Sequence, residues 1–314
     1  MKNYTKISDI KELLPMLEEA LQLKKENSDP QLGKGKTLGM LFFNPSLRTR
    51  LSTEKAAKLL GMDVMVMNVN SDAWALEFED GVVMDSNKAE HIKEGAAVLS
   101  QYCDIIAVRA FPELKNKEKD NAETVINGFI KYASAPIVSL ESATGHPLQA
   151  LTDALTILEL KKVKRPKVVL TWAPHPRALP HAVPNSFVEM MQRMDVDLVV
   201  TNPEGYDLNP NIIKDTQVIH DQEKALEDAD FVYVKNWSSY EEYGKVLSTD
   251  AAWTFSNEKL AKTNNAKVMH CLPVRRNVVI ADEVLDGENS VVIHQANNRT
   301  FAAQAVLKTL LKNL

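Results

Sequence analysis

The sequence contains little of several features that mark particular classes of protein. It has two cysteines in 314 residues, which is too few for a disulfide framework and fits a reducing compartment. No apolar run approaches the roughly 18 residues that a membrane-spanning helix needs, and residues 1–6 lack the apolar core of a signal peptide. The glycine patterns of Walker and dinucleotide-binding loops are missing, as is any Cys/His cluster with zinc spacing. We therefore expect no metal and no cofactor.

An overall excess of positive charge is also missing. The net charge is −5, so no global basic field attracts nucleic acid or a membrane surface. The composition is otherwise that of an ordinary soluble globular protein. We expect a cytoplasmic protein in which positive sites are local features.

At 314 residues the chain is longer than one typical hydrophobic core supports, so we expect two domains. Strand-like apolar runs alternate with helical patterns. The expected strands lie at 37–43, 63–68, 104–109, 136–140, 167–172, 196–201, 216–219, 230–234, 267–271 and 290–293. The expected helices lie at 9–25, 46–61, 88–102, 121–134, 146–162 and 300–311. This alternation predicts an α/β fold with two doubly wound parallel-sheet domains joined by interdomain helices.

A long helical pattern over residues 147–162 separates the two sets of strands, and we expect Pro166 to end it. We assign residues 1–145 to the first domain and residues 146–297 to the second, with this helix as the link. The last segment, 298–314, is expected to pack back on the first domain.

The most informative polar motif runs from Ser46 to Arg50. It follows the expected strand 37–43 and opens a helical pattern, so it lies at the carboxyl end of a strand. Backbone N–H groups and the positive end of the helix dipole point there, and Ser46 is expected to cap the helix. Arg48 and Arg50 add forked donors that suit phosphate oxygens. The motif predicts a site for a small dianion, although a capped helix with solvated arginines would have the same pattern.

Three further polar motifs lie at the ends of expected elements. Arg109 closes the strand 104–109, where it would point toward the anion motif. His146 precedes a proline at the first helical position, and Gln149 follows one turn later on that helix. His-Cys-Leu-Pro at 270–273 ends a strand of the second domain. Each motif also has a plain structural interpretation, as a surface arginine, a structural histidine and a small buried cysteine.

Taken in chain order, these motifs resemble those of the aspartate/ornithine carbamoyltransferase family. Ser-x-Arg-Thr-Arg at 46–50, the strand-end Arg109, His-Pro-Leu-Gln at 146–149 and His-Cys-Leu-Pro at 270–273 all match. The cysteine of the last motif is similar to the ornithine-type branch. The resemblance implies the fold of that family, with carbamoyl phosphate bound by the first domain and the second substrate bound by the second.

The chain departs from ordinary ornithine enzymes in its second domain. It lacks their Ser-Met-Gly motif, and the matching strand carries Lys235, which suits a carboxylate and not a free ammonium. This strand and the sequence 171–177, which contains His175, resemble the branch that acts on N-acylated ornithine. The region of Trp74 fits that branch too, where the loop reaches into a neighbouring subunit's site. The resemblance thus implies a homotrimer with sites at the subunit interfaces.

The residue at position 89 indicates which acyl group the second substrate carries. The acetyl-type relatives carry Glu at the position matching Ala89, and the succinyl-type relatives carry Pro. A glutamate there would repel a succinyl carboxylate by roughly 1–4 kcal/mol at effective dielectrics of about 80 down to 20. Ala89 removes that repulsion and Lys88 offers attraction, which favours a succinyl group. If the alignment with these relatives shifts by one residue, Glu90 is the matching residue, so an acetyl group is the alternative.

The resemblance implies transfer of the carbamoyl group of carbamoyl phosphate to the δ-amine of N-succinylornithine in arginine biosynthesis. Phosphate leaves and is able to accept the amine proton. The residues expected at carbamoyl phosphate are Ser46, Leu47, Arg48, Thr49, Arg50, Trp74, Arg109, His146, Gln149, Cys271, Leu272 and Arg299. Those expected at the acylated ornithine are Glu141, His175, Lys235, Arg275 and Ala89.

The resemblance also implies individual roles. Thr49, Arg109 and His146 would polarise the carbonyl oxygen as an oxyanion forms. The Gln149 side chain and the Leu272 carbonyl would accept hydrogen bonds from the carbamoyl NH₂. Cys271 completes the catalytic set because it lies close to the amine, without acting as a nucleophile.

Two interpretations from other classes stay open at this point. One is a regulatory paralogue that binds the anion as a sensor without catalysis, and the full set of catalytic-type residues argues against it. The other is a nucleotide-binding α/β protein, which the missing glycine loop disfavours.

Overall fold

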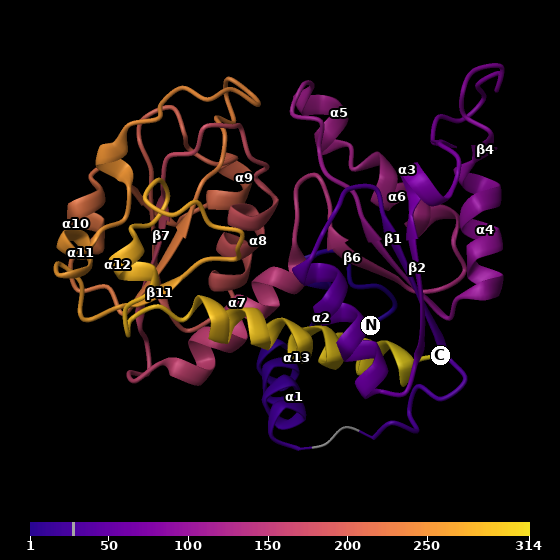
Figure 1. Ribbon diagram of the computed structural model, residues 1–314, viewed down its shortest axis with the longest axis horizontal. Helices are drawn as coiled ribbons and strands as arrows, with labels where there is room; N and C mark the ends of the chain where they lie inside the picture. Colours follow the sequence, from indigo (N-terminus) through magenta and orange to yellow (C-terminus); the bar gives the residue numbers. More distant parts are fainter. Residues whose placement is uncertain (27–28) are drawn as a thin grey trace. The chain divides into compact units, whose positions relative to one another are not determined.

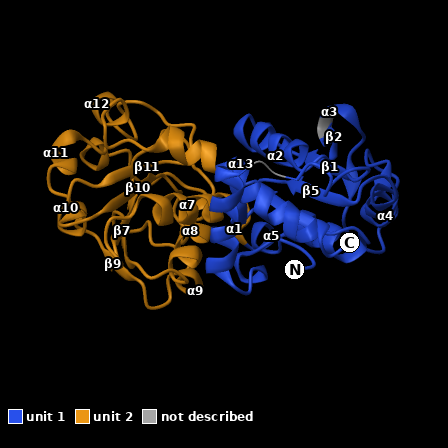
Figure 2. Cartoon of the chain, turned by 90° about the horizontal axis from the view of Figure 1, so that it is seen from below, with its two compact units in different colours: residues 1–113, 118–148, 299–314 blue, residues 114–117, 149–298 orange. Residues whose placement is uncertain are grey.

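The computed structural model describes residues 1–26 and 29–314, and the chain forms two compact units (Figure 2). Unit 1 consists of Met1–Glu113, Glu118–Leu148 and Arg299–Leu314, and unit 2 consists of Leu114–Lys117 and Gln149–Asn298. Each unit has its own parallel sheet, so the predicted α/β fold class is confirmed.

Unit 1 is built on a four-stranded parallel sheet in the order β2-β1-β5-β6 (Figure 1). Its strands are β1 (Thr37–Phe42), β2 (Asp63–Asn68), β5 (Ile105–Arg109) and β6 (Ile137–Glu141). The strands β5 and β6 are buried along their whole length, as expected for near-continuous apolar runs in a parallel sheet. The outer strand β2 alternates between exposed and half-buried residues at its start.

Helices connect the strands of unit 1. The remaining elements are η1 (Ile7–Asp9), α1 (Leu13–Lys25), α2 (Arg48–Leu59), α3 (Val69–Asp72), β3 (Leu76–Glu77), β4 (Glu90–His91), α4 (Ile92–Tyr102), α5 (Lys117–Asn121) and α6 (Thr124–Tyr132). One face of the sheet packs on α4 and α6 through a core that contains Ile92, Ile106 and Phe129. This packing fixes the carboxyl ends of β1, β5 and β6, where the predicted site residues begin.

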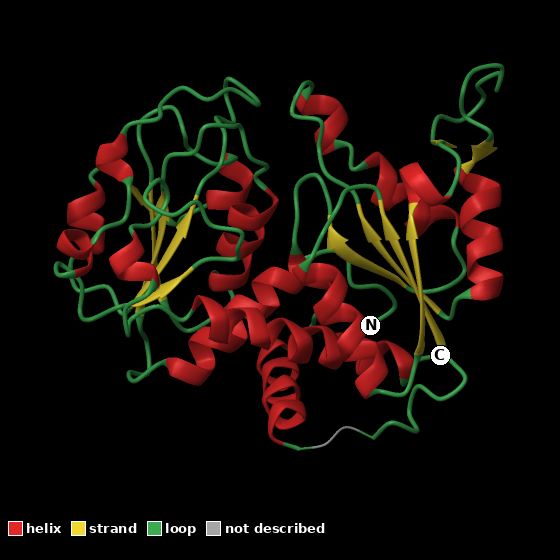
Figure 3. Cartoon of the chain, viewed as in Figure 1, coloured by secondary structure: helices red, strands yellow, loops and turns green. Residues whose placement is uncertain are grey.

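Unit 2 has a five-stranded parallel sheet in the order β11-β10-β7-β8-β9. Its strands are β7 (Lys167–Trp172), β8 (Asp197–Thr201), β9 (Gln217–Ile219), β10 (Phe231–Lys235) and β11 (Lys267–Met269). Its helices are α8 (Ala182–Met191), α9 (Pro210–Ile213), α10 (Gln222–Leu226), η2 (Ala251–Trp253), α11 (Asn257–Leu260) and α12 (Asp282–Leu285), together with parts of α7 (Pro147–Leu160) and α13 (Val292–Leu311). Figures 1 and 3 show α8 and α9 on one side of this sheet and α10 and α11 on the other.

The chain passes between the units on either side of Leu114–Lys117 and again within two helices, α7 and α13. The division falls inside α7, after Leu148, and inside α13, before Arg299. The part of α13 in unit 1 contacts that unit through Lys308, whose Nζ lies 2.5 Å from the Glu19 carboxylate. Within the described part of the chain, no helix has both the length and the apolar character needed to cross a membrane.

Three local expectations are wrong. Residues 290–293 are not a strand, because Val292 opens α13 and packs in the core of unit 2, and Ser290 forms only an isolated bridge. Ser46 does not cap α2, since the N-cap is Leu47 and no side chain caps it. The helix α7 ends at Leu160, well before Pro166.

Candidate active site

In unit 1 the anion motif lies where β1 is followed by α2. The Phe43 N–H donates to the Arg109 carbonyl (2.9 Å), which ties the connecting segment to the neighbouring strand. Ser46, Arg48 and Arg50 are half-buried and Thr49 is buried, while Leu47 is 65% exposed. The first-turn N–H groups of a helix have no partner inside the helix, so this end of α2 favours an anion.

Arg109 holds the same segment from the end of β5. Its Nη1 donates to the carbonyls of Asn44 (3.0 Å) and Pro45 (2.6 Å), and its Nη2 donates to a Glu141 carboxylate oxygen (3.1 Å). The guanidinium lies over the ring of Phe111 at 4.0 Å. Burial lowers the pKa of Arg109 and Glu141 opposes this change. Arg109 thus contacts the two residues that immediately precede the anion motif.

His146 lies beside the Arg109–Glu141 pair. It is 3% exposed, and its Nε2 is 3.7 Å from the Glu141 carboxylate. Burial, followed by the charges of Arg299 and Arg109, holds the pKa of His146 well below its usual value. The ring is therefore neutral near pH 7, and it is able to donate one N–H to a carbonyl oxygen. The structure thus brings Glu141, expected at the acylated ornithine, next to residues expected at carbamoyl phosphate.

Arg299 joins this group from α13. Its Nη2 donates to the Thr49 hydroxyl at 2.7 Å, and both residues are buried. Because the Thr49 oxygen accepts this bond, its hydroxyl hydrogen points elsewhere and is able to serve a ligand. The charge of Arg48 also acts on Arg109. We call Arg48, Thr49, Arg109, His146 and Arg299 the unit 1 cluster.

The loop that precedes His146 is held by a residue that the sequence did not single out. The Glu123 carboxylate accepts from the Ser142 hydroxyl (2.6 Å), the backbone N–H groups of Ala143 (3.1 Å) and Thr144 (2.7 Å), and the Thr144 hydroxyl (2.5 Å). Glu123 itself has a left-handed backbone, with φ of 51°. No sequence signal predicted this contact, because the two segments meet only in the folded sheet.

The segment that contains Trp74 and Ala89 is mostly exposed. Trp74 is 58% exposed, and its ring N–H donates to Glu90 (2.6 Å). Lys88 is paired with Glu77 (3.0 Å), and hydrogen bonds from the Glu79 N–H and from Lys88 lower the pKa of Glu77 to about 2. The charge of Lys88 is thus already balanced, which weakens the expectation that it attracts a succinyl carboxylate. Ala89 itself is exposed.

In unit 2 the residues expected at the acylated ornithine form a second group of cations. The Arg275 Nε donates to the His175 Nε2 at 3.0 Å. The other ring nitrogen lies 2.9 Å from the Arg177 carbonyl oxygen and 3.1 Å from the Arg177 backbone nitrogen. Burial, followed by the charges of Arg275 and Lys235, lowers the pKa of His175. Lys235 is 8% exposed and donates to the Asn236 carbonyl (2.7 Å). These groups together suit a carboxylate.

Gln149, Cys271 and Leu272 also belong to unit 2. The Gln149 amide donates to Asp153 at 2.7 Å. The Leu272 N–H donates to the His270 ring (2.8 Å), and Cys271 beside it is half-buried. Asp153 was not predicted, although the spacing of Gln149 and Asp153 on a helix is the signal that would have found it.

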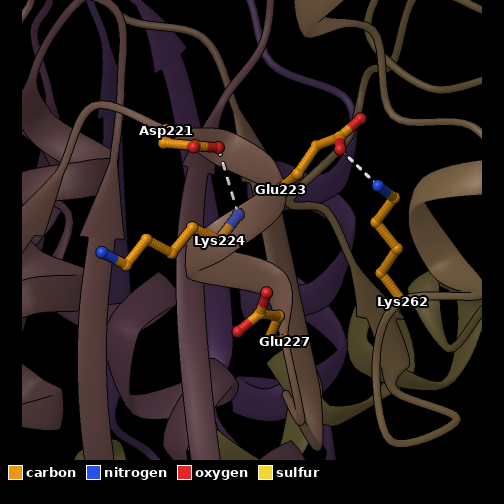
Figure 4. Close-up of a pocket in the computed structure, with 5 residues that line it drawn as sticks. All are labelled: Asp221, Glu223, Lys224, Glu227 and Lys262. Carbon is orange, nitrogen blue, oxygen red and sulfur yellow. Dashed lines mark hydrogen bonds and ion pairs between the residues drawn. The ribbon is translucent and has the colours of Figure 1, made fainter.

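A cavity of about 590 Å³ lies elsewhere in unit 2 (Figure 4). It is lined by Asp221, Glu223, Lys224, Glu227 and Lys262. Glu223 is ion-paired with Lys262, and the Asp221 side chain caps α10 through the Lys224 N–H (3.1 Å). These contacts serve the helix end, and no predicted site residue lines the cavity. Among the described residues, no group of three or more His, Cys, Asp or Glu side chains is arranged to hold a metal ion.

Comparison with known proteins agrees with this geometry. Residues 2–159 match the carbamoyl-P binding domain of the aspartate/ornithine carbamoyltransferase family, and residues 181–310 match its Asp/Orn binding domain. The N-succinylornithine carbamoyltransferase of Bacteroides fragilis (strain 638R) is 52% identical over the full length of both chains. The N-acetylornithine carbamoyltransferase of Xanthomonas axonopodis pv. citri (strain 306) is 37% identical, over 95% of this chain and 93% of that one.

A solved structure supports the same relationship. An N-acetyl-L-ornithine transcarbamylase in which a glutamate is replaced by alanine, complexed with carbamyl phosphate and N-succinyl-L-norvaline, matches with a TM-score of 0.94. The match has 35% sequence identity and covers 99% of this chain and 100% of that one. The matched domains span most of the sequence and contain the motifs around Arg109 and His146. The chain therefore belongs to the aspartate/ornithine carbamoyltransferase family.

Proposed function

We propose that this protein transfers the carbamoyl group of carbamoyl phosphate to the δ-amine of N-succinyl-L-ornithine, giving N-succinylcitrulline and phosphate, in arginine biosynthesis. The observation that carries the proposal is the unit 1 cluster at the start of α2, in a chain 52% identical to an enzyme of that name. Acetyl-type relatives are more distant, at 37% identity for the Xanthomonas axonopodis enzyme.

Unit 1 would bind carbamoyl phosphate. The phosphate would lie at the N-terminus of α2, where Ser46, Arg48 and Arg50 supply donors and positive charge. Thr49, Arg109 and the neutral His146 would donate to the carbonyl oxygen, which becomes an oxyanion when the amine attacks. Donors fixed in advance at that atom stabilise the transition state more than the ground state.

Unit 2 would bind the acylated ornithine and complete the chemistry. Arg275, His175 and Lys235 would hold its carboxylates, with Cys271 close to the attacking amine. The amine attacks the carbonyl carbon, the bond from that carbon to the phosphate oxygen breaks, and the departing phosphate takes the amine proton. No metal or cofactor enters these steps. Much of the rate would come from holding two substrates in one geometry.

The acyl group is proposed to be succinyl because of Ala89. Solved N-acetyl-L-ornithine transcarbamylases in which a glutamate is replaced by alanine or proline are complexed with N-succinyl-L-norvaline. If Ala89 occupies the position of that glutamate, the repulsion of a second carboxylate is absent here. Lys88 does not enter this argument, because Glu77 already balances its charge.

We also propose a cytoplasmic homotrimer in which Trp74 of one subunit reaches the carbamoyl phosphate of the next. Trp74 is 58% exposed and Val83 is 81% exposed, so the segment that contains them presents apolar surface in a single chain. Sedimentation of the purified protein tests the subunit number.

A citrulline assay with succinyl-, acetyl- and free ornithine tests the reaction and the substrate together. We expect turnover to be highest on N-succinylornithine. Higher turnover on N-acetylornithine would reject the choice of acyl group. An inactive protein that still binds carbamoyl phosphate would reject catalysis and favour an anion sensor.

A further inference from the structure

A buried carboxylate lies under two residues proposed to bind the carbamoyl group. Asp153 is fully buried in α7, one turn after Gln149. Its Oδ1 atom accepts from the Gln149 Nε2 and from the Gln295 Nε2, each at 2.7 Å. A buried carboxylate needs such donors, because an uncompensated buried charge is costly.

These two bonds fix the orientation of both amides. An ionised carboxylate only accepts hydrogen bonds, so each glutamine must present its nitrogen to Asp153. The oxygen of each amide then lies on the side away from Asp153. In Gln295 that oxygen accepts from the His270 N–H at 3.0 Å. In Gln149 the amide oxygen is placed as a hydrogen-bond acceptor on the far side of the group.

The Gln295 contact extends to the end of β11. His270 holds the next turn of the chain, since its Nδ1 accepts from the Leu272 N–H at 2.8 Å. The backbone of Leu272 has a φ of 57°, a conformation that non-glycine residues rarely adopt. A continuous set of hydrogen bonds thus runs from Asp153 through Gln295 and His270 to Leu272.

Tyr233 lies near both Asp153 and this turn. Its ring is fully buried, and burial followed by the charges of Asp153 and Cys271 raises its pKa well above the usual value. Asp153 and Cys271 are therefore both near the same buried hydroxyl. The Asp153 carboxylate on α7 therefore lies close to the 270–272 turn.

We propose that Asp153 is a positioning residue that holds the Gln149 amide oxygen and the Leu272 carbonyl as the two acceptors for the carbamoyl NH₂. The proposal rests on the proposed function of the same site. It gives the site a means of selecting carbamoyl phosphate over acetyl phosphate, which has a methyl group in place of the NH₂. A site built to accept N–H bonds loses them with the analogue, and its buried acceptors are left unpaired.

The test compares the two phosphates in Asp153→Leu and Asp153→Asn. The leucine removes the acceptor, so we expect the KM for carbamoyl phosphate to rise about 30-fold, which corresponds to two neutral hydrogen bonds. The inhibition constant of acetyl phosphate should change less than about threefold, because its methyl group makes neither bond. Asp153→Asn retains one oxygen that is able to accept from both glutamines, and it should keep most of the wild-type preference.

A double-variant cycle separates positioning from general damage. If Asp153 acts partly through Gln149, Asp153→Leu combined with Gln149→Leu should cost less than the product of the two single effects. The control is Thr156→Val, a buried polar residue on the same helix that bonds Asn298 (3.0 Å) and should leave the preference unchanged. If Asp153→Leu does not fold, Gln295→Met is the second variant. It removes only the hydrogen bonds that connect Asp153 to His270 and Leu272, and it should raise the KM for carbamoyl phosphate about fivefold.

The outcomes distinguish this inference from the proposed function. Equal weakening of both phosphates, or no change in their ratio in Asp153→Leu or Gln295→Met, would overturn the positioning role while wild-type turnover persists. A wild-type protein that forms no citrulline derivative from any ornithine would instead overturn the proposed function. In that case the ratio of binding constants for the two phosphates, measured by calorimetry, still decides whether Asp153 sets the preference.

Discussion

In unit 1 the predicted site residues are buried charges that pair with one another, whereas in unit 2 buried neutral amides share one carboxylate. Arg109 and Glu141 are both nearly inaccessible and bond at 3.1 Å. In unit 2 Gln149 and Gln295 are buried with Asp153, and the exposed Arg275 side chain donates to the half-buried His175. The two units thus fix their donors and acceptors by different means.

The difference follows from the chemical group that each of these two sets of residues would contact. A dianion whose charge moves during the reaction is stabilised best by charged donors that are fixed before it arrives, since they need no reorganisation. A neutral NH₂ group is recognised by acceptors, and amide orientation decides whether an acceptor or a donor faces it. Charge in the unit 1 cluster should therefore control rate, and hydrogen-bond geometry in unit 2 should control the choice of carbamoyl phosphate over acetyl phosphate.

The largest effect is expected from Arg109→Ala. This change removes a proposed oxyanion donor and the tie to the Asn44 and Pro45 carbonyls, and it leaves Glu141 buried without its arginine. We expect kcat to fall by about 100- to 1000-fold. Steady-state assays at saturating substrates measure it.

The matched control is Arg165→Ala. Arg165 pairs with Asp195 at 3.6 Å on an open surface, where 63% of its side chain is exposed. Its loss should leave kcat within about twofold, because exposed ion pairs contribute little. If Arg109→Ala retained full turnover, the charge-based account of unit 1 would be rejected.

Glu123→Ala should have the next largest effect. It removes a carboxylate that accepts four hydrogen bonds from the loop that leads to His146. The variant therefore tests whether the position of the His146 ring depends on this loop contact. We expect the unfolding free energy to fall by about 2–3 kcal/mol and kcat to fall about tenfold. Urea denaturation and turnover measure the two quantities.

Glu118→Ala is the control for Glu123→Ala, because Glu118 is an exposed residue at the start of the preceding helix. It should change neither stability nor turnover appreciably. A loss of stability in Glu123→Ala with unchanged kcat would show that His146 keeps its position without this loop contact.

Much of the fold was predictable because parallel strands here are short apolar runs between polar turns. The exception at 290–293 is instructive, since Val291, Val292 and Ile293 form an apolar run as well. Periodicity does not distinguish a short strand from the start of a buried helix. Only the burial of Val292 against the core of unit 2 decides it.

The site was predictable where a residue stands at the end of an element. Arg109 closes β5 and His146 precedes α7, so their positions follow from the topology. Asp153 and Gln295 are 142 positions apart, and their contact depends on how α13 packs. The roles of Glu123 and Asp153 therefore required the folded structure.

The choice between N-succinylornithine and N-acetylornithine tests the role of Ala89, which lies outside the unit 1 cluster. Ala89→Glu would introduce a carboxylate where a succinyl carboxylate is proposed to lie, with a repulsion of roughly 1–4 kcal/mol. We expect kcat/KM for N-succinylornithine to fall about tenfold or more, and that for N-acetylornithine to change little. Ser86→Glu, in the same exposed segment, is the charge-matched control. Equal losses on both substrates would remove Ala89 from the account of selectivity.

The smallest expected effect is on stability at mildly acidic pH, and it probes the neutral histidine among the charges of unit 1. The folded pKa of His146 is held below its ordinary value of about 6.5 by burial and by Arg299 and Arg109. The unfolded chain therefore binds a proton more readily, so the stability from this group is present above pH 6.5 and is lost as the pH falls below it.

We expect the urea midpoint of the wild type to decrease as the pH is lowered from about 7 to about 5. In His146→Gln the urea midpoint should depend less steeply on pH over that range. His175 and His181 also have lowered pKa values, so part of the slope should survive in the variant. An unchanged slope in His146→Gln would mean that burial and the charges of Arg299 and Arg109 do not hold this ring neutral.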